Sequence, residues 1–352
     1  LMATALLHSV MATSEKGIFK SWTILLSIFT FSLSLLGTFL VRSGILISVH
    51  SFANDPSRGI FILIMLVALI GGGLLAYAFN SKKFVDENEV KLYSKEGFFL
   101  LNNILLVTAT FTILLGTMYP LFLDILGLEK ISVGVPYYNA VFIPLMIPLM
   151  LLVGYVPILL SRLTKKAQLL QLVIIFILSL LLSFIFSVKS ILFFIGIFSS
   201  VWILGNIFTD LYKTSDNKVK IKNRAGMYFA HFGLAIFIIG ASVSENNKIE
   251  KEFTINIGET KTVGLFDYKF EDLKEFQSVN YDALIASIVV SKNDQFITEL
   301  NPEKRLYHSS DSPMTEAGID GRLDRDLYVS LGNMVAENKW SMRIYDKPLS
   351  RL

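Results

Sequence analysis

The sequence predicts an all-α polytopic membrane helix bundle followed by a C-terminal β-rich domain. Seven apolar runs each reach 18 residues or more, which is the length a helix needs to cross a hydrocarbon core. Hydrophobic residues make up 53% of the chain and mean hydropathy is +0.57, values that lie outside the soluble globular class. Residues 244–352 differ from the rest, because they carry nineteen acidic and fourteen basic residues and short alternating apolar stretches.

The helix bundle is predicted to contain eight membrane segments within residues 1–243. The first, Leu1–Thr13, is too short to span, so we interpret it as the stub of a longer helix and the chain as a fragment. Three prolines inside one later span predict a kinked helix within the bundle, because neighbouring helices must satisfy the freed backbone groups. The full spans are predicted at Ser21–Val41, Arg58–Phe79, Gly97–Met118, Tyr138–Leu160, Gln168–Val188, Ser190–Thr209 and Gly226–Val243.

The connectors between these spans predict the orientation of the chain. Lys and Arg number fourteen in one alternating set of connectors, which includes Ser14–Lys20, and four in the other. Because cytoplasmic connectors carry the excess of positive charge, Ser14–Lys20 is predicted to be cytoplasmic. The long connector within Gly37–Gly59 and the domain 244–352 then face outward.

The outward domain is predicted to be built from short strands. Alternation of apolar and polar residues in Phe253–Ile257, Ile285–Val290 and Leu327–Leu331 indicates strands with one buried face, and Gly258 marks a turn.

Several common chemistries are excluded by the sequence of the whole chain. The chain has no cysteine, so it forms no disulfide and supplies no thiol, and it has no Gly-rich phosphate loop or basic nucleic-acid patch.

Two of the four histidines fall inside predicted membrane helices. His8 lies seven residues before Glu15 and His231 lies seven residues after Arg224, so both are predicted at one depth, roughly 10 Å inside. Two neutral imidazoles at one level can hold a metal between two helices, as in bis-His ligation of haem iron. The alternative is two separate histidines that each bond a neighbouring backbone carbonyl or hydroxyl.

The outward connector carries a third histidine, His50, between Arg42 and Arg58. Such long ordered connectors are disproportionately functional, and the two arginines can pair with the carboxylates of a bound cofactor. The alternatives are an interfacial loop with an incidental histidine and ordinary snorkelling of the arginines. His308 lies in a polar, turn-like run and is predicted to be a surface histidine.

Several stretches resemble the CcmF family, the haem-handling subunits of bacterial System I cytochrome c maturation, together with their NrfE-type relatives. They include TALLHSVMATSEKG, LLGTFLVRSGILISVHSFANDPSRG, RAGMYFAHFG, NPEKRLY and DLYVSLG. By this resemblance, His8 and His231 match the two transmembrane ligands of a resident haem b, and His50 matches the second periplasmic histidine. The Trp-rich haem-binding segment, the first periplasmic histidine and the last helix of the family are absent from this chain.

The resemblance implies the activity of a cytochrome c haem lyase. A transient haem delivered by the chaperone holo-CcmE would be joined to the two thiols of a Cys-x-x-Cys-His motif in apocytochrome c. The buried haem b would pass electrons, with quinol as a donor, and CcmH/CcmI-type subunits would be further partners. The competing class is a non-enzymatic haem transporter or an assembly scaffold, which intramembrane histidines and proline-rich helices fit as well.

Overall fold

The computed structural model describes residues 1–42, 56–86, 90–91, 93–128, 131, 133–161, 163–308, 313–349 and 351. The chain divides into two compact units, Leu1–Thr164 with Asn206–Asp216, and Lys165–Gly205 with Asn217–Leu352. The change in composition after residue 243 predicts two domains, 1–243 and 244–352, and this division stays a prediction. The helices are α1 (Met2–Lys16), α2 (Lys20–Arg42), α3 (Pro56–Asn80), η1 (Ser81–Phe84), α4 (Lys95–Ile125), α5 (Val135–Tyr137), η2 (Tyr138–Phe142), α6 (Ile143–Ser161), α7 (Lys165–Ile185), α8 (Ile191–Thr214) and α9 (Lys218–Asn247).

Seven helices in the described part of the chain are long and apolar enough to cross a membrane. They begin with α2, α3 and α4, continue through the segment Val135–Pro157, and end with α7, α8 and α9. Each overlaps one predicted span over most of its length, so the polytopic bundle is confirmed. The helices extend past the predicted ends where polar residues continue them, as in α9, which starts at Lys218 with the Asn217 side chain capping the Lys220 N–H.

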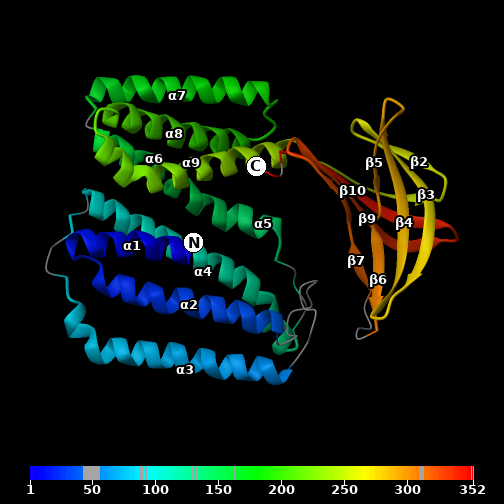
Figure 1. The fold of residues 1–352 in the computed structure, drawn as a ribbon, viewed down its shortest axis with the longest axis horizontal. Helices are drawn as coiled ribbons and strands as arrows, with labels where there is room; N and C mark the ends of the chain where they lie inside the picture. The colour runs from blue at the N-terminus through cyan, green and yellow to red at the C-terminus, as the bar shows by residue number, and fades with distance from the viewer. Residues whose placement is uncertain are drawn as a thin grey trace. The chain divides into compact units, whose positions relative to one another are not determined.

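In the first unit, α1 lies against α2 and α4 (Figure 1). Lys16 at the end of α1 forms an ion pair with Glu96 in the first turn of α4, and Lys95 lies 3.7 Å from Glu15. The end of α1 therefore meets the start of α4, so the two helices run in opposite directions. Their apolar contacts form a cluster whose buried members are Met2, Ala5, Leu26, Leu106 and Leu149.

The turn from α1 into α2 is closed by a carboxylate from the segment after α3. Gly17 takes the left-handed conformation that ends many helices, and the buried Phe19 also has a positive φ of 63°. Asp86 accepts the N–H of Phe19 at 2.9 Å and the N–H of Lys20 at 3.0 Å. Because these N–H groups begin α2, the carboxylate caps the helix and favours the strained Phe19 backbone.

The proline-rich span opens with a short π-helical turn, η2, before α6. Pro144 is the second residue of α6, and Pro148 and Pro157 lie further along the same helix. Tyr137 donates its hydroxyl to the Thr112 carbonyl of α4 at 2.9 Å. The irregular start of this span is therefore tied to a neighbouring membrane helix, as a spanning segment with freed backbone groups requires.

In the second unit, small residues let the helices approach closely. A Cβ added at Gly196 of α8 would overlap the Ser242 hydroxyl of α9 and lie 3.1 Å from its Cβ. A Cβ at Gly205 would lie 3.0 Å from the Ile175 side chain of α7. Such glycines are typical of membrane helix interfaces, where backbone contact replaces the missing hydrophobic driving force.

A short connection joins α7 to α8, and a side chain of α9 closes it. Asn246 accepts the N–H of Lys189 at 3.0 Å and donates to the carbonyls of Phe186 and Ser187, each at 3.3 Å. Ser187 has a positive φ of 55°, which turns the chain within this short connection. The end of α9 is thereby fixed to this connection.

The chain then enters a β-sandwich (Figure 1). One sheet has the strand order β1-β10-β9-β8, and the other has the order β2-β3-β4-β6-β7, with β5 also paired to β4. All pairs are antiparallel, and the predicted strands and the Gly258 turn are confirmed. The strands are β1 (Ile249–Asn256), β2 (Thr260–Val263), β3 (Phe266–Gln277), β4 (Tyr281–Lys292), β5 (Gln295–Leu300), β6 (Glu303–Tyr307), β7 (Met314–Glu316), β8 (Gly318–Gly321), β9 (Arg325–Ala336) and β10 (Lys339–Pro348).

The core of the sandwich lies between the two sheets. Phe266, Tyr268 and Phe270 of β3 alternate inward with no exposed surface, and Leu327, Val329 and Leu331 of β9 face them in one cluster. This period of two is the pattern by which one face of each strand is buried.

Candidate functional site

His8 is held on α1 by a hydrogen bond to its own helix. Its Nδ1 lies 2.8 Å from the carbonyl oxygen of Thr4, one turn earlier. Because a carbonyl oxygen only accepts, Nδ1 carries the proton and Nε2 keeps its lone pair. A histidine that ligates a metal is oriented in this way, with one nitrogen donating to a carbonyl and the other bound to the metal. In its neutral form the ring would therefore offer Nε2 as the atom that can bind a metal.

The surroundings of His8 come from α4. The Phe99 ring lies 5.8 Å from the imidazole, centroid to centroid, at an angle of 52°. Phe99 also packs with Trp22 of α2 around the buried cluster Ala12, Ile18 and Phe19. Phe99 thus gives the partly buried imidazole one apolar wall, of the kind that an apolar macrocycle requires.

Two adjacent amides on α4 were not predicted from the sequence. Asn103 lies one helical turn beyond Phe99 and has no exposed surface, and Asn102 is 9% exposed. Neither the oxygen nor the nitrogen of the Asn103 amide has a hydrogen-bond partner among the described residues. Their signal was available in the sequence, as a pair of amides in the otherwise apolar run Gly97–Met118.

His231 lies in the apolar part of α9, between the buried Tyr228 and Ala235, with its side chain partly exposed. It belongs to the second compact unit, whereas His8 belongs to the first. The pairing of the two imidazoles across one interface stays a prediction.

The predicted outward site falls largely beyond the described part of the chain. His50 lies outside the described residues. Arg42 is the last residue of α2 and Arg58 lies in the first turn of α3, and their side chains are likewise outside the description. His308 follows β6 with its side chain 51% exposed, and its Nε2 lies 3.6 Å from Asp282. That position agrees with the predicted surface histidine.

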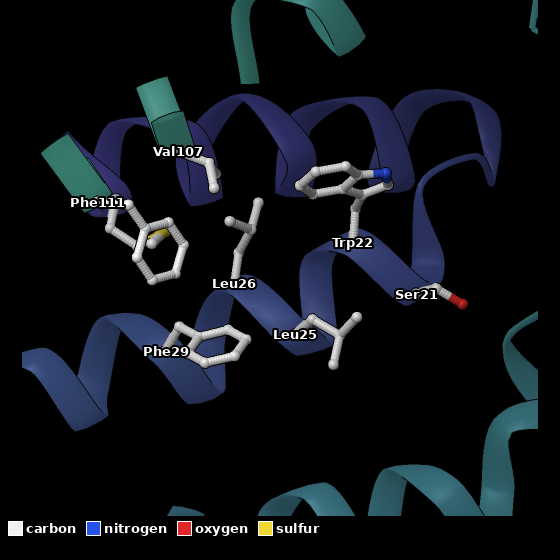
Figure 2. A pocket seen from close by; sticks show the side chains of 8 residues that line it. Ser21, Trp22, Leu25, Leu26, Phe29, Val107 and Phe111 are labelled. Atoms are coloured by element: carbon white, nitrogen blue, oxygen red, sulfur yellow. The ribbon is translucent and has the colours of Figure 1, made fainter. Parts of the chain in front are cut away.

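A cavity of about 200 Å³ lies between α1, α2 and α4 (Figure 2). Trp22, Leu26 and Phe29 of α2 project into it opposite Val107 and Phe111 of α4, and no predicted site residue lines it. Its walls are almost entirely apolar, so it suits hydrocarbon rather than a polar ligand. The lining residues are Met2, Ser21, Trp22, Leu25, Leu26, Phe29, Val107 and Phe111.

A polar cluster occupies one end of the β-sandwich. The Arg325 guanidinium of β9 stacks 4.1 Å from the Phe266 ring centre, and Lys292 lies 5.7 Å from the same centre. Burial raises the pKa of the Asp346 carboxyl above its usual value, although Arg325 and Lys292 oppose that rise and Asp324 adds to it. Burial also raises the pKa of the Tyr268 hydroxyl, an effect that Asp346 increases. These groups affect the stability of the domain, and none is a predicted site residue.

Comparison with known proteins relates the whole chain to one family. Residues 246–348 match the family described as the CcmF C-terminal beta-sandwich. The full chain is 39% identical to the cytochrome c-type biogenesis protein CcmF of Escherichia coli strain K12, of which it covers 55%. It is 38% identical to the protein of that name from Haemophilus influenzae, covering 56% of that relative.

The chain belongs to the CcmF family. It spans about half the length of the curated CcmF relatives that it matches. A solved structure named Cytochrome c Heme Lyase CcmF shares its fold, with a TM-score of 0.71 over 99% of this chain and 54% of that one, at 20% identity. Membership of the CcmF family and the apolar helices together establish a multi-pass membrane protein.

Proposed function

We propose that this chain is the histidine-bearing part of a cytochrome c haem lyase that acts in cytochrome c-type biogenesis. The observation that carries the proposal is the geometry of His8. Its Nδ1–H is occupied by the Thr4 carbonyl, so Nε2 is left as the metal-binding atom within an apolar helix bundle. The names of the CcmF relatives and of the structural neighbour support the same activity.

His8 and His231 are the proposed axial ligands of a resident haem b. The residues fit this group, because axial ligation needs one imidazole from each of two helices, and Phe99 supplies an apolar wall beside His8. Among the described residues no three His, Asp or Glu side chains converge, and iron within a porphyrin does not need such a cluster. When bound, this haem supplies a one-electron Fe(III)/Fe(II) couple, with quinol as the proposed donor.

The outward connector is the proposed site of the substrate haem. His50 holds the iron until the histidine of the substrate motif replaces it, while Arg42 and Arg58 pair with the two propionates. Each thiol of apocytochrome c then adds across a vinyl group. Sulfur bonds to one vinyl carbon and the proton goes to the other, so the step consumes no oxidant or reductant. This chain contributes positioning, which accounts for the absence of cysteine from its sequence.

The proposal places the protein in the bacterial inner membrane, with the β-sandwich in the periplasm. Its partners are holo-CcmE, which delivers haem, CcmH/CcmI-type subunits and apocytochrome c. The arrangement is supported by the distribution of Lys and Arg, which number fourteen on the predicted cytoplasmic side and four on the other.

The test uses the intact protein and its reduced-minus-oxidised haem spectrum. His8→Ala or His231→Ala should abolish the spectrum of the buried haem, whereas His308→Ala, the matched surface control, should leave it unchanged. His50→Ala should lose cytochrome c maturation while the buried haem persists, and added imidazole should partly restore outer haem binding. Normal maturation by His50→Ala would overturn the lyase assignment in favour of a scaffold.

A further inference from the structure

The Asn103 amide lies next to the proposed haem site without a partner of its own. It occupies the face of α4 that carries Phe99, because residues four apart on a helix lie one above the other. Phe99 in turn contacts the His8 ring. Asn103 therefore lies about one helical turn, or 5–6 Å, along α4 from a side chain that touches the imidazole.

Burial makes this amide costly. Its side chain has no exposed surface, and both its oxygen and its nitrogen are unbonded among the residues described. Leaving such groups unpaired costs about 1–3 kcal/mol each in a protein interior, so an apolar residue of similar size would be more stable there. Other polar groups on α4 avoid this cost within the helix, as when Thr112 donates its hydroxyl to the Thr108 carbonyl.

We propose that Asn103 is a positioning residue whose amide donates a hydrogen bond to a carboxylate of the macrocycle held by His8. An amide N–H₂ is a neutral donor, and a carboxylate is the hydrogen-bonding substituent that haem carries on its edge. The inference rests on the proposed function, because it takes the group at His8 to be haem.

The test is haem titration of the intact protein after haem removal, with haem and with its dimethyl ester as probes. Esterification removes the carboxylate charge and leaves the ring and iron unchanged. Asn103→Leu should weaken haem binding about tenfold or more and have little effect on the ester, because a hydrogen bond to a charged group contributes about 1.5–3 kcal/mol. The wild type should bind the ester more weakly than haem by a similar factor.

The controls separate this inference from the function on which it rests. Thr112→Val removes an exposed polar group of α4 that already bonds its own helix, and it should bind both probes as the wild type does. The haem-free Asn103→Leu protein should melt at or above the wild-type temperature, because an unpaired buried amide has been removed.

Two results would overturn the assignment of Asn103. One is equal affinity of the wild type for haem and its ester, a comparison that does not depend on how the variant folds. The other is a large loss of stability in haem-free Asn103→Leu, which would show that the amide serves the protein itself. If His8→Ala bound haem normally, the proposed function would fail. If His8→Ala lost haem but Asn103→Leu did not, the inference alone would fail.

Discussion

Asn246, near the end of α9, accepts the backbone N–H of Lys189 in the turn between α7 and α8, at a distance of 3.0 Å. Its amide nitrogen also reaches the carbonyls of Phe186 and Ser187. One side chain thus forms hydrogen bonds with three backbone groups of this turn. The amide therefore joins three membrane helices where the chain leaves α9 for the β-sandwich.

Asn246→Leu should lower the thermal stability of the detergent-solubilised protein. The substitution leaves the Lys189 N–H and two carbonyls without this partner in a partly buried turn, at a cost of about 1–3 kcal/mol for each group that stays unsatisfied. Melting curves of the two proteins provide the measurement. Asn80→Leu is the matched control, because its amide donates to the Ala76 carbonyl within its own helix. Equal melting temperatures for wild type and Asn246→Leu would refute the structural role.

The cap on α2 leads to a second prediction. Asp86→Ala should destabilise the protein by about 0.5–2 kcal/mol, the usual effect of losing a helix cap. Asp86→Asn keeps one acceptor oxygen for the N–H groups of Phe19 and Lys20, so its effect should be intermediate. Denaturant titration of the purified proteins measures both changes. The order alanine, asparagine, wild type in rising stability is the expected result, and any other order contradicts the cap.

Close helix packing leads to a third prediction. Gly196→Ala should destabilise the second unit, because the added methyl group overlaps the Ser242 hydroxyl. The double variant Gly196→Ala/Ser242→Gly should recover part of the loss, since it restores the space on the facing helix. Thermal melts of the four proteins in this cycle measure the coupling. Additive effects of the two changes would show that the two residues do not meet.

The raised pKa of the Asp346 carboxyl leads to a prediction of how the stability of the β-sandwich depends on pH. Its folded-state pKa is raised above the unfolded value by burial, so the folded domain keeps a proton that the unfolded chain has released. The free energy of unfolding contributed by this group therefore falls as pH rises through the window between the two pKa values. Asp346→Asn should remove that slope and raise stability at neutral pH.

The measurement is the melting temperature of the intact protein, followed by its β-sheet circular dichroism, below and above that window. Asp294→Asn is the control, because Asp294 is exposed in the turn between β4 and β5. If the melting temperatures of the wild type and of Asp346→Asn both rise with pH through the window, burial of Asp346 does not control the pH dependence of stability.

Composition and periodicity were sufficient to predict the seven spans and the strands around Phe253, Ile285 and Leu327. Those signals reflect burial against lipid or against a facing sheet, which depends on local pattern. The polar extension of α9 back to Lys218 was missed, because hydropathy marks the apolar part of a helix and not its capped ends.

The site depends on contacts that a sequence does not display. His8 was singled out from its place in an apolar run, but its orientation by Thr4 and its contact with Phe99 required the packed helices. Asn103 was overlooked because only tertiary packing decides whether an amide in a membrane span is buried without a partner. The roles of His8, His231, His50, Arg42 and Arg58 stay predictions.

The pairing of β1 with β10 brings the two ends of the β-sandwich together. Ile249 is opposite Asp346 in this antiparallel pair, so the chain returns to within about 5 Å of the place where it entered the domain. The whole sandwich can therefore be exchanged for another domain with adjacent ends without moving the end of α9. Such a replacement offers a direct way to learn which steps of the protein's work are carried out by the helices alone.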